Sequence, residues 1–143
     1  MKYWICVCKK YDKDWQEEYG AEWEWWKNGE SGDKGGRHTA CFEQMREGDK
    51  VLCYQTSKHS FTAELEVSEK FEANSKMKLT FKCKINIPLE CVTQDEHYQK
   101  ILDSNADKYS PFTKDKSNLF FGTFFATTKA QFEYICALAQ CNE

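Results

Sequence analysis

The sequence has no run of roughly 18 apolar residues, so we expect no segment of it to span a membrane. Its first residues, Met1-Lys2-Tyr3-Trp4, lack the separate apolar region and small-residue cleavage site of a signal peptide, and we therefore expect a cytoplasmic protein. Net positive charge is missing as well, because the formal net charge is −3. A domain that holds nucleic acid by its phosphates alone is normally basic, so this charge disfavours a pure backbone binder.

The common catalytic and metal-binding motifs are also missing. The three histidines are scattered, and the sequence contains no serine elbow, phosphate-binding loop or zinc-protease helix. None of the eight cysteines belongs to a Cys-x-x-Cys pair, so we expect no zinc site. Most of them stand where an apolar residue would serve, which is typical of free, buried thiols in a reducing compartment. We predict a binding protein without metal or cofactor rather than an enzyme.

What the chain does have is enough length for one core and a large share of aromatic side chains. Its 143 residues suffice for one hydrophobic core and are too few for two, so residues 1–143 are predicted to form a single, monomeric domain. Aromatic residues make up 15% of the chain, and Trp23, Trp25 and Trp26 lie within four positions. A glycine-rich stretch at 28–36 follows them and has the composition of a loop. The tryptophan cluster is the feature that a function must explain.

Hydrophobic periodicity predicts the strands. Residues 2–8 form an apolar run typical of a strand buried on both faces, and 51–55 and 119–125 are also strand-like. Residues 61–71 and 78–87 alternate between apolar and polar side chains, which predicts a hairpin. Its inner faces would carry Phe61, Ala63, Leu65 and Val67 on the first strand and Leu79, Phe81, Cys83, Ile85 and Ile87 on the second. On the outer faces, Glu64 and Glu66 are expected to oppose Lys82 and Lys84.

Threonines mark the expected helix starts. Thr39 is the predicted N-cap of a short helix that turns Phe42 and Met45 inward. Thr93 and Thr128 each open a capping box, the second one before the final helix. Together the elements predict an α+β fold, with a small curved, mostly antiparallel sheet or partly open β-barrel of about five or six strands and two or three packed helices.

Four features, taken in order, resemble the EVE domain, a PUA-like domain related to the YTH and ASCH domains. They are the opening Met1-Lys2-Tyr3-Trp4, Trp26 before a variable loop, the segment from Met45 to Tyr54, and Gly122 with the final Thr-capped helix. The most specific part is the helix, Gly-Asp and apolar strand that ends in a tyrosine. The resemblance covers essentially the whole chain, although Lys27-Asn28-Gly29-Glu30 stands where the family usually has Gly-Val-Arg-Asn.

The resemblance implies a pocket for a flipped, often modified, nucleobase of DNA or RNA. Aromatic walls contribute roughly 1–3 kcal/mol per stacked base, and positioned polar groups select the base edge. In an extended segment Trp23 and Trp25 point to one side and Trp26 to the other. The candidate base contacts are Trp26, Trp25, Trp23, Tyr54, Gln55, Thr56 and Ser57. The candidate phosphate contacts are Arg37, Lys58, His59, Lys9 and Lys10.

Each of these residues also has a purely structural interpretation. The tryptophans are as well suited to the core as to a pocket, and the lysines to a solvated surface. Two other functions stay open, an ASCH-like hydrolase of a modified nucleoside and a protein-interaction domain with an exposed tryptophan patch. A reader of this size is expected to serve an effector such as a nuclease, either fused or separate.

Overall fold

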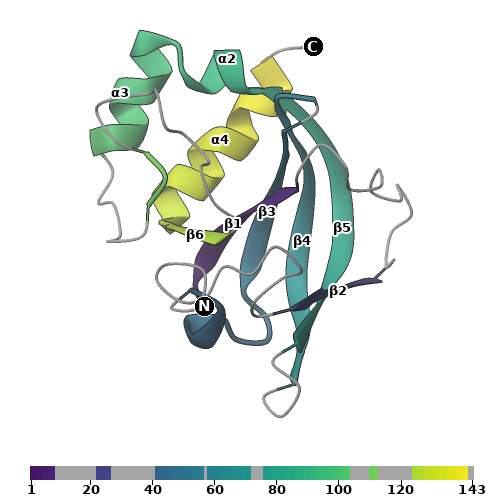
Figure 1. Cartoon of the computed structure of the whole chain (residues 1–143). Helices are drawn as coiled ribbons and strands as arrows, with labels where there is room; N and C mark the ends of the chain where they lie inside the picture. The colour runs from purple at the N-terminus through teal and green to yellow at the C-terminus, as the bar shows by residue number, and fades with distance from the viewer. Residues whose placement is uncertain are drawn as a thin grey trace.

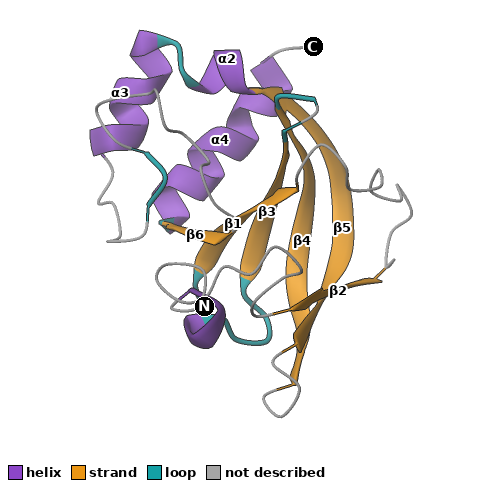
Figure 2. Ribbon diagram, viewed as in Figure 1, coloured by secondary structure: helices purple, strands orange, loops and turns teal. Residues whose placement is uncertain are grey.

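The computed structural model describes residues 1–8, 22–26, 41–56, 58–71, 76–103, 110–112 and 124–141, with the backbone alone for 8, 22–26, 76 and 139–141. These residues form one sheet with three helices packed against one face and a short helical turn against the other (Figures 1 and 2). The strands are β1 (Tyr3–Cys8), β2 (Glu22–Trp26), β3 (Lys50–Gln55), β4 (Ser60–Phe71), β5 (Lys76–Pro88) and β6 (Phe124–Thr127). The helices are α2 (Leu89–Val92), α3 (Asp95–Asp103) and α4 (Lys129–Cys141), and residues 41–44 form a further helical turn.

The sheet is mostly antiparallel and open. Its six strands follow the order β2-β5-β4-β3-β1-β6, so β2 and β6 are the two edges. Only the β1–β3 pair is parallel, and the other four pairs run antiparallel. This arrangement confirms the α+β fold and the curved, open sheet that the sequence predicts. Within the described ranges, no helix has both the length and the apolar character needed to cross a membrane.

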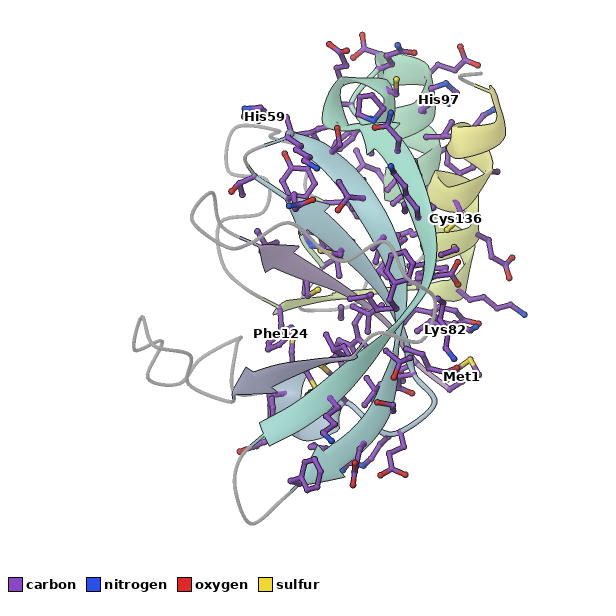
Figure 3. The ribbon with its side chains drawn as sticks, turned by 90° about the vertical axis from the view of Figure 1, so that its right-hand side faces the viewer. Met1, His59, Lys82, His97, Phe124 and Cys136 are labelled. Atoms are coloured by element: carbon purple, nitrogen blue, oxygen red, sulfur yellow. The ribbon has the colours of Figure 1, made fainter. Side chains whose placement is uncertain are left out.

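Each face of the sheet buries a hydrophobic core. On the concave face, Trp4 and Cys6 pack with Phe42 and Met45 of the 41–45 segment, as expected for a short helix turned inward. On the opposite face, Ile5 of β1 packs with residues of α2, α3 and α4. Figure 3 shows Phe124 on the concave side of the sheet and Cys136 of α4 on the other side. Burial on both faces confirms the prediction for the first strand and explains why its apolar run is continuous.

Register shifts correct the expected faces of Phe61 on β4 and of Cys83, Ile85 and Ile87 on β5. Tyr54 pairs with Phe61 while Cys53 pairs with Ala63, so Thr62 is an extra residue in β4. Phe61 therefore joins the core under the helices, whereas Ala63 belongs to the concave core. A second shift separates the Glu64–Cys83 pair from the Leu65–Phe81 pair. Because each bulge reverses the phase of a strand, Cys83 is exposed rather than inward, and Ile85 is only half-buried.

The outer face of the hairpin carries one of the two expected ion pairs. Lys82 Nζ lies 3.6 Å from Glu66 Oε2, but Glu64 pairs with Lys50 of β3 at 3.9 Å. Lys84 is opposite Ala63 in the register, so the expectation that it opposes one of the two glutamates was wrong. The same shift that exposes Cys83 places Lys84 opposite Ala63, a residue of the concave core.

The two predicted capping boxes differ in outcome. At α4 the Thr128 hydroxyl accepts a hydrogen bond from Gln131 N at 3.1 Å, and Gln131 Oε1 accepts one from Thr128 N at 3.4 Å, which confirms that box. At α3 the first-turn bond runs from Tyr98 N to Gln94 O. Thr93 instead ends α2, where its hydroxyl donates to Leu89 O at 3.1 Å. The intervening short helix α2 explains why the assignment of Thr93 as the start of α3 was wrong.

Candidate functional site

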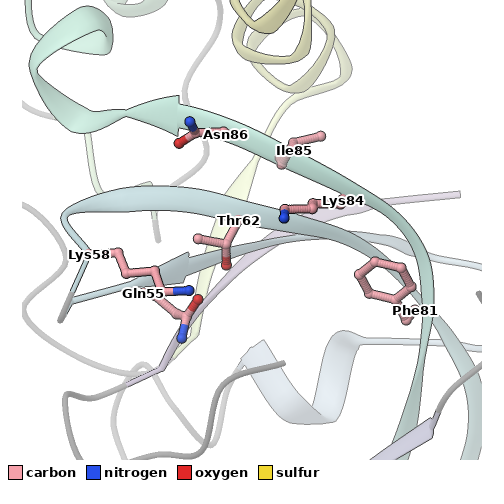
Figure 4. A pocket seen from close by; sticks show the side chains of 7 residues that line it. All are labelled: Gln55, Lys58, Thr62, Phe81, Lys84, Ile85 and Asn86. Carbon is pink, nitrogen blue, oxygen red and sulfur yellow. The ribbon is translucent and has the colours of Figure 1, made fainter. Parts of the chain in front are cut away.

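A hollow of about 260 Å³ lies where β3, β4 and β5 run together near the hairpin turn between β3 and β4 (Figure 4). We call it the β3–β5 hollow. Its lining residues are Gln55, Lys58, Thr62, Phe81, Lys84, Ile85 and Asn86. Its volume is a little below the roughly 300–1,000 Å³ of pockets for drug-sized ligands, so it has the scale of one small ring system.

The hollow is a product of the β-bulges. Thr62 has no opposite residue on β3, because the register there jumps from Ala63 to Phe61. On β5 the regular pairing with β4 breaks between Lys84 and Ile87, where the two residues Ile85 and Asn86 face the single residue Thr62. All three of these residues line the hollow. Bulges bend strands and re-aim side chains, and here several adjacent shifts open a space that a regular sheet would fill.

Two polar side chains stand inside this space. Gln55 is 2% exposed, and it ends β3 on the side opposite to Tyr54. The Thr62 Oγ1 is buried, and among the described residues it is the one buried side-chain oxygen or nitrogen without a hydrogen-bond partner. Figure 4 shows the Gln55 amide, the Thr62 hydroxyl and the Lys58 ammonium group at one end of the hollow, with Phe81 toward the other. A buried hydroxyl without a partner costs about 1–3 kcal/mol, which a hydrogen-bonding group at this position would recover.

The walls and rim of the hollow combine an aromatic ring with positive charge. Phe81 is 3% exposed and belongs to the concave core, so its ring is a fixed wall. Two exposed lysines line the hollow, Lys58 from the turn between β3 and β4 and Lys84 from β5. Asn86 adds a second carboxamide, also exposed. The site therefore offers an apolar ring surface, hydrogen-bonding groups along an edge and cations where the space opens to solvent.

The structure brings two of the sequence-predicted contacts, Gln55 and Lys58, into this hollow. Tyr54 is 3% exposed and lies in the core under the helices, with its ring 5.3 Å from that of Phe61. Burial raises the pKa of its hydroxyl. Its ring is thus on the opposite face of β3 from the hollow, as the period of two along a strand requires.

The remaining polar candidates are near the turn or outside the described residues. Thr56 is half-buried in the turn, and His59 is exposed there with a φ of 48°. The His59 carbonyl accepts a hydrogen bond from Leu89 N at 2.8 Å, which anchors the turn to α2. Lys9, Lys10, Arg37 and Ser57 lie outside the described residues.

The tryptophan segment forms the edge strand next to β5. The register pairs Glu22 with Thr80, Trp23 with Leu79, Trp25 with Met77 and Trp26 with Lys76. The backbone of Trp23 is therefore the closest of the three to Phe81 and the hollow. At about 3.3 Å per residue, the backbone of Trp26 is about 10 Å farther along β5. The side chains of this strand lie outside the described residues, and their role in base stacking stays a prediction.

Sequence reasoning missed most of the lining of the hollow. Phe81 fits the alternating pattern of an ordinary core residue, and Lys84 fits that of a solvated stripe. The bulges bring three further residues into the lining: Thr62, Ile85 and Asn86. The local composition of the sequence does not predict where these bulges fall. The one available signal was the polar run that begins at Gln55 directly after an apolar strand.

Comparison with known proteins gives a fold and no family. No family model matches the chain, and no curated protein matches it. The NMR structure of Rpa0253 from Rhodopseudomonas palustris is similar, with a TM-score of 0.68 and 12% sequence identity over 100% of this chain and 96% of that one. The X-ray structure of a Pseudomonas putida protein has a TM-score of 0.58 and 13% identity over 96% of this chain and 99% of that one. At these identities the likeness shows a shared fold alone.

Proposed function

We propose that this chain is a binding module that holds one unstacked nucleobase of RNA or DNA in the β3–β5 hollow. The observation that carries the proposal is the buried Thr62 hydroxyl without a partner, beside the Gln55 amide and facing a space of about 260 Å³. A base has a polar edge and two apolar faces, so it needs hydrogen-bonding groups in one plane and an apolar or aromatic surface beside them. Gln55, Thr62 and Phe81 supply that combination.

The charges around the hollow support a ligand that carries phosphate. Lys58 and Lys84 stand at its rim, and the described lining residues include no carboxylate. In nucleic-acid complexes, contacts to phosphates position the chain, while contacts to the base specify it. With a net charge of −3, the whole molecule does not attract a polyanion, so affinity must come from the site itself.

The EVE-like features of the sequence extend the proposal to the kind of base. They favour a modified base, with the tryptophans of β2 as further stacking surfaces, in a monomeric cytoplasmic reader that serves an effector such as a nuclease. Taking a base out of a helix costs a few kcal/mol. Stacking and edge contacts of roughly 1–3 kcal/mol each can offset that cost.

The first test is equilibrium binding of single- and double-stranded oligonucleotides with common modified bases to Thr62→Val and Gln55→Ala variants. Val has nearly the shape of Thr and removes only the hydroxyl. We expect Thr62→Val to lower the affinity about ten-fold, which corresponds to about 1.4 kcal/mol. We also expect it to raise the free energy of unfolding slightly, because a buried hydroxyl without a partner disappears.

Gln99→Ala is the matched control for Gln55→Ala, since Gln99 is exposed on α3. It should leave both affinity and stability unchanged. Unchanged affinity in Thr62→Val and Gln55→Ala, with the Gln99→Ala value equal to theirs, contradicts a base site in this hollow. The variants Trp23→Ala, Trp25→Ala and Trp26→Ala test separately whether β2 contributes to oligonucleotide binding.

A further inference from the structure

Two thiols from distant parts of the chain share a neighbour, Glu64, on the helix-covered face of the sheet. Cys83 of β5 is exposed, and its Sγ donates a hydrogen bond to Glu64 Oε2 at 3.3 Å. Cys136 of α4 is half-buried. It lines a hollow of about 400 Å³ together with the same Glu64 and with Lys50 of β3. Glu64 is thus the shared neighbour of both thiols.

Burial and the Glu64 carboxylate raise the pKa values of both thiols. Burial and the Glu64 carboxylate raise the pKa of Cys83 to about 11, against a smaller lowering by Lys50. Burial raises the pKa of Cys136 to about 12, with further increases from the nearby Glu64, Cys83 and Glu133. The Cys83 thiolate is thus one of the groups that raise the pKa of Cys136.

The sheet register explains why the sequence does not predict that Cys83 and Cys136 lie on the same face of the sheet. Alternation along β5 places Cys83 inward with Phe81, but the bulge between the Glu64–Cys83 and Leu65–Phe81 pairs turns it to the opposite face. That face is the one covered by α4, which packs against β5. Among the other cysteines whose side chains are described, Cys6, Cys41 and Cys53 are buried in the concave core, and Cys91 is half-buried at α2.

We propose that Cys83 and Cys136 form a modification site for small disulfides of the glutathione class, which ends in an intramolecular disulfide that ties α4 to β5. Cys83 reacts first, because it is the exposed member of the pair. It gives its proton to a base in solution, and its sulfur attacks the small disulfide, releasing one reduced thiol and leaving a mixed disulfide. Cys136 then loses its proton and attacks the Cys83 sulfur, which releases the second reduced thiol. Two protein thiols are oxidised and one small disulfide is reduced.

The raised pKa values make this a slow site at neutral pH and set its pH dependence. The thiolate is the reacting form, and its fraction rises about ten-fold per pH unit below the pKa. The groups that face the pair are Glu64 from β4, Lys50 from β3 and Glu133 from α4. We expect the first exchange step to accelerate about ten-fold per pH unit from neutral pH to about pH 10, because the pKa of Cys83 is about 11.

The test uses the full chain, oxidised glutathione at about pH 9 and peptide mapping by mass spectrometry without reductant. We expect a peptide pair joined through Cys83 and Cys136, with two hydrogens lost and no glutathione retained. In Cys136→Ser, glutathione should stay on Cys83, and in Cys91→Ser, the matched control, the cross-link should still form. The oxidised wild type should melt at least about 5 °C higher than the reduced protein, because the bond closes a long loop.

Persistence of a glutathione adduct on Cys83 of the wild type overturns the proposal, as does a lack of reaction at both thiols. The mapping is done on the wild type, so the answer does not depend on whether a serine variant folds. Oligonucleotide binding is a separate readout, since the β3–β5 hollow and this thiol pair are on different faces of the sheet.

Discussion

At the scale of single residues, Asp49 ties the start of the chain to the rest of the sheet. Its carboxylate is 3% exposed and accepts three hydrogen bonds. Oδ1 receives the backbone N–H of Lys2 at 3.0 Å, and Oδ2 receives the Trp4 indole N–H and the Arg46 backbone N–H, both at 2.9 Å. Gly48, with a φ of 91°, turns the chain directly before it, a backbone conformation that favours glycine. The Gly-Asp pair therefore has a physical role at this position.

Substituting Asp49→Ala should lower the free energy of unfolding by about 3 kcal/mol, because three donors lose their acceptor in a site that water barely reaches. Asp49→Asn keeps one acceptor oxygen and should cost about half as much. Urea denaturation with a constant slope measures both values. Asp103→Ala is the control, since that aspartate is exposed on α3 and should change stability by less than about 0.5 kcal/mol. Equal losses at positions 49 and 103 contradict this account of Asp49.

At the scale of elements, one buried side chain joins α3, β6 and α4. Gln131 is 0% exposed. Its Nε2 donates to Ile101 O near the end of α3 at 2.9 Å, and its Oε1 accepts from the Thr127 hydroxyl of β6 at 2.8 Å. The amide thus takes up one of the carbonyls that the last turn of α3 leaves without a helical donor.

Gln131→Leu should loosen α3 more than the rest of the molecule. The substitution removes the donor to Ile101 O and the acceptor for Thr127, and we expect a loss of about 2 kcal/mol in the free energy of unfolding. Hydrogen exchange should accelerate in residues 95–103 before it does in β3 and β4. Gln99→Leu, on the exposed side of the same helix, is the matched control and should leave that exchange unchanged. Uniform acceleration over helix and sheet would argue against a local link.

Most elements could be predicted from the sequence, because burial leaves a periodic trace. Trp4, Ile5, Cys6 and Val7 read as a strand buried on both faces, and they are. The Thr128–Gln131 box marks the start of α4 for a local reason that requires only neighbouring residues. Such features depend only on the types of neighbouring residues, so they can be predicted from the sequence alone.

The candidate site could not be predicted to the same extent, since it depends on register. Thr62 differs from a regular strand residue only because no residue of β3 pairs with it. Cys83 is exposed only because of the bulge beside it in β5. Pairing energies over entire strands decide where a bulge falls, and a local pattern does not record them. Gln55 and Lys58 were found because they follow the strand end, where polar side chains stand out.

At the scale of the whole molecule, charge and site would make opposite contributions to the nucleic-acid binding that we propose. The net charge of −3 repels a polyanion at long range, while Lys58 and Lys84 stand at the rim of the β3–β5 hollow. On the sheet surface, Lys82 forms an ion pair with Glu66 and Lys78 forms one with Glu69. A reader built in this way should bind through its pocket and through very few phosphates.

The salt dependence of oligonucleotide binding measures this balance directly. For single strands each neutralised phosphate contributes about −0.7 to the slope of log K against log salt, so two lysines predict a slope of about −1.4. Lys58→Ala and Lys84→Ala should each reduce its magnitude by about 0.7 and weaken all sequences alike. Lys129→Ala is the control, because its side chain is 69% exposed and pairs with Glu133 on α4. The slope could instead be several times steeper, unchanged in Lys58→Ala and Lys84→Ala but reduced in Lys129→Ala. That result would show that oligonucleotides bind the general surface and not the hollow.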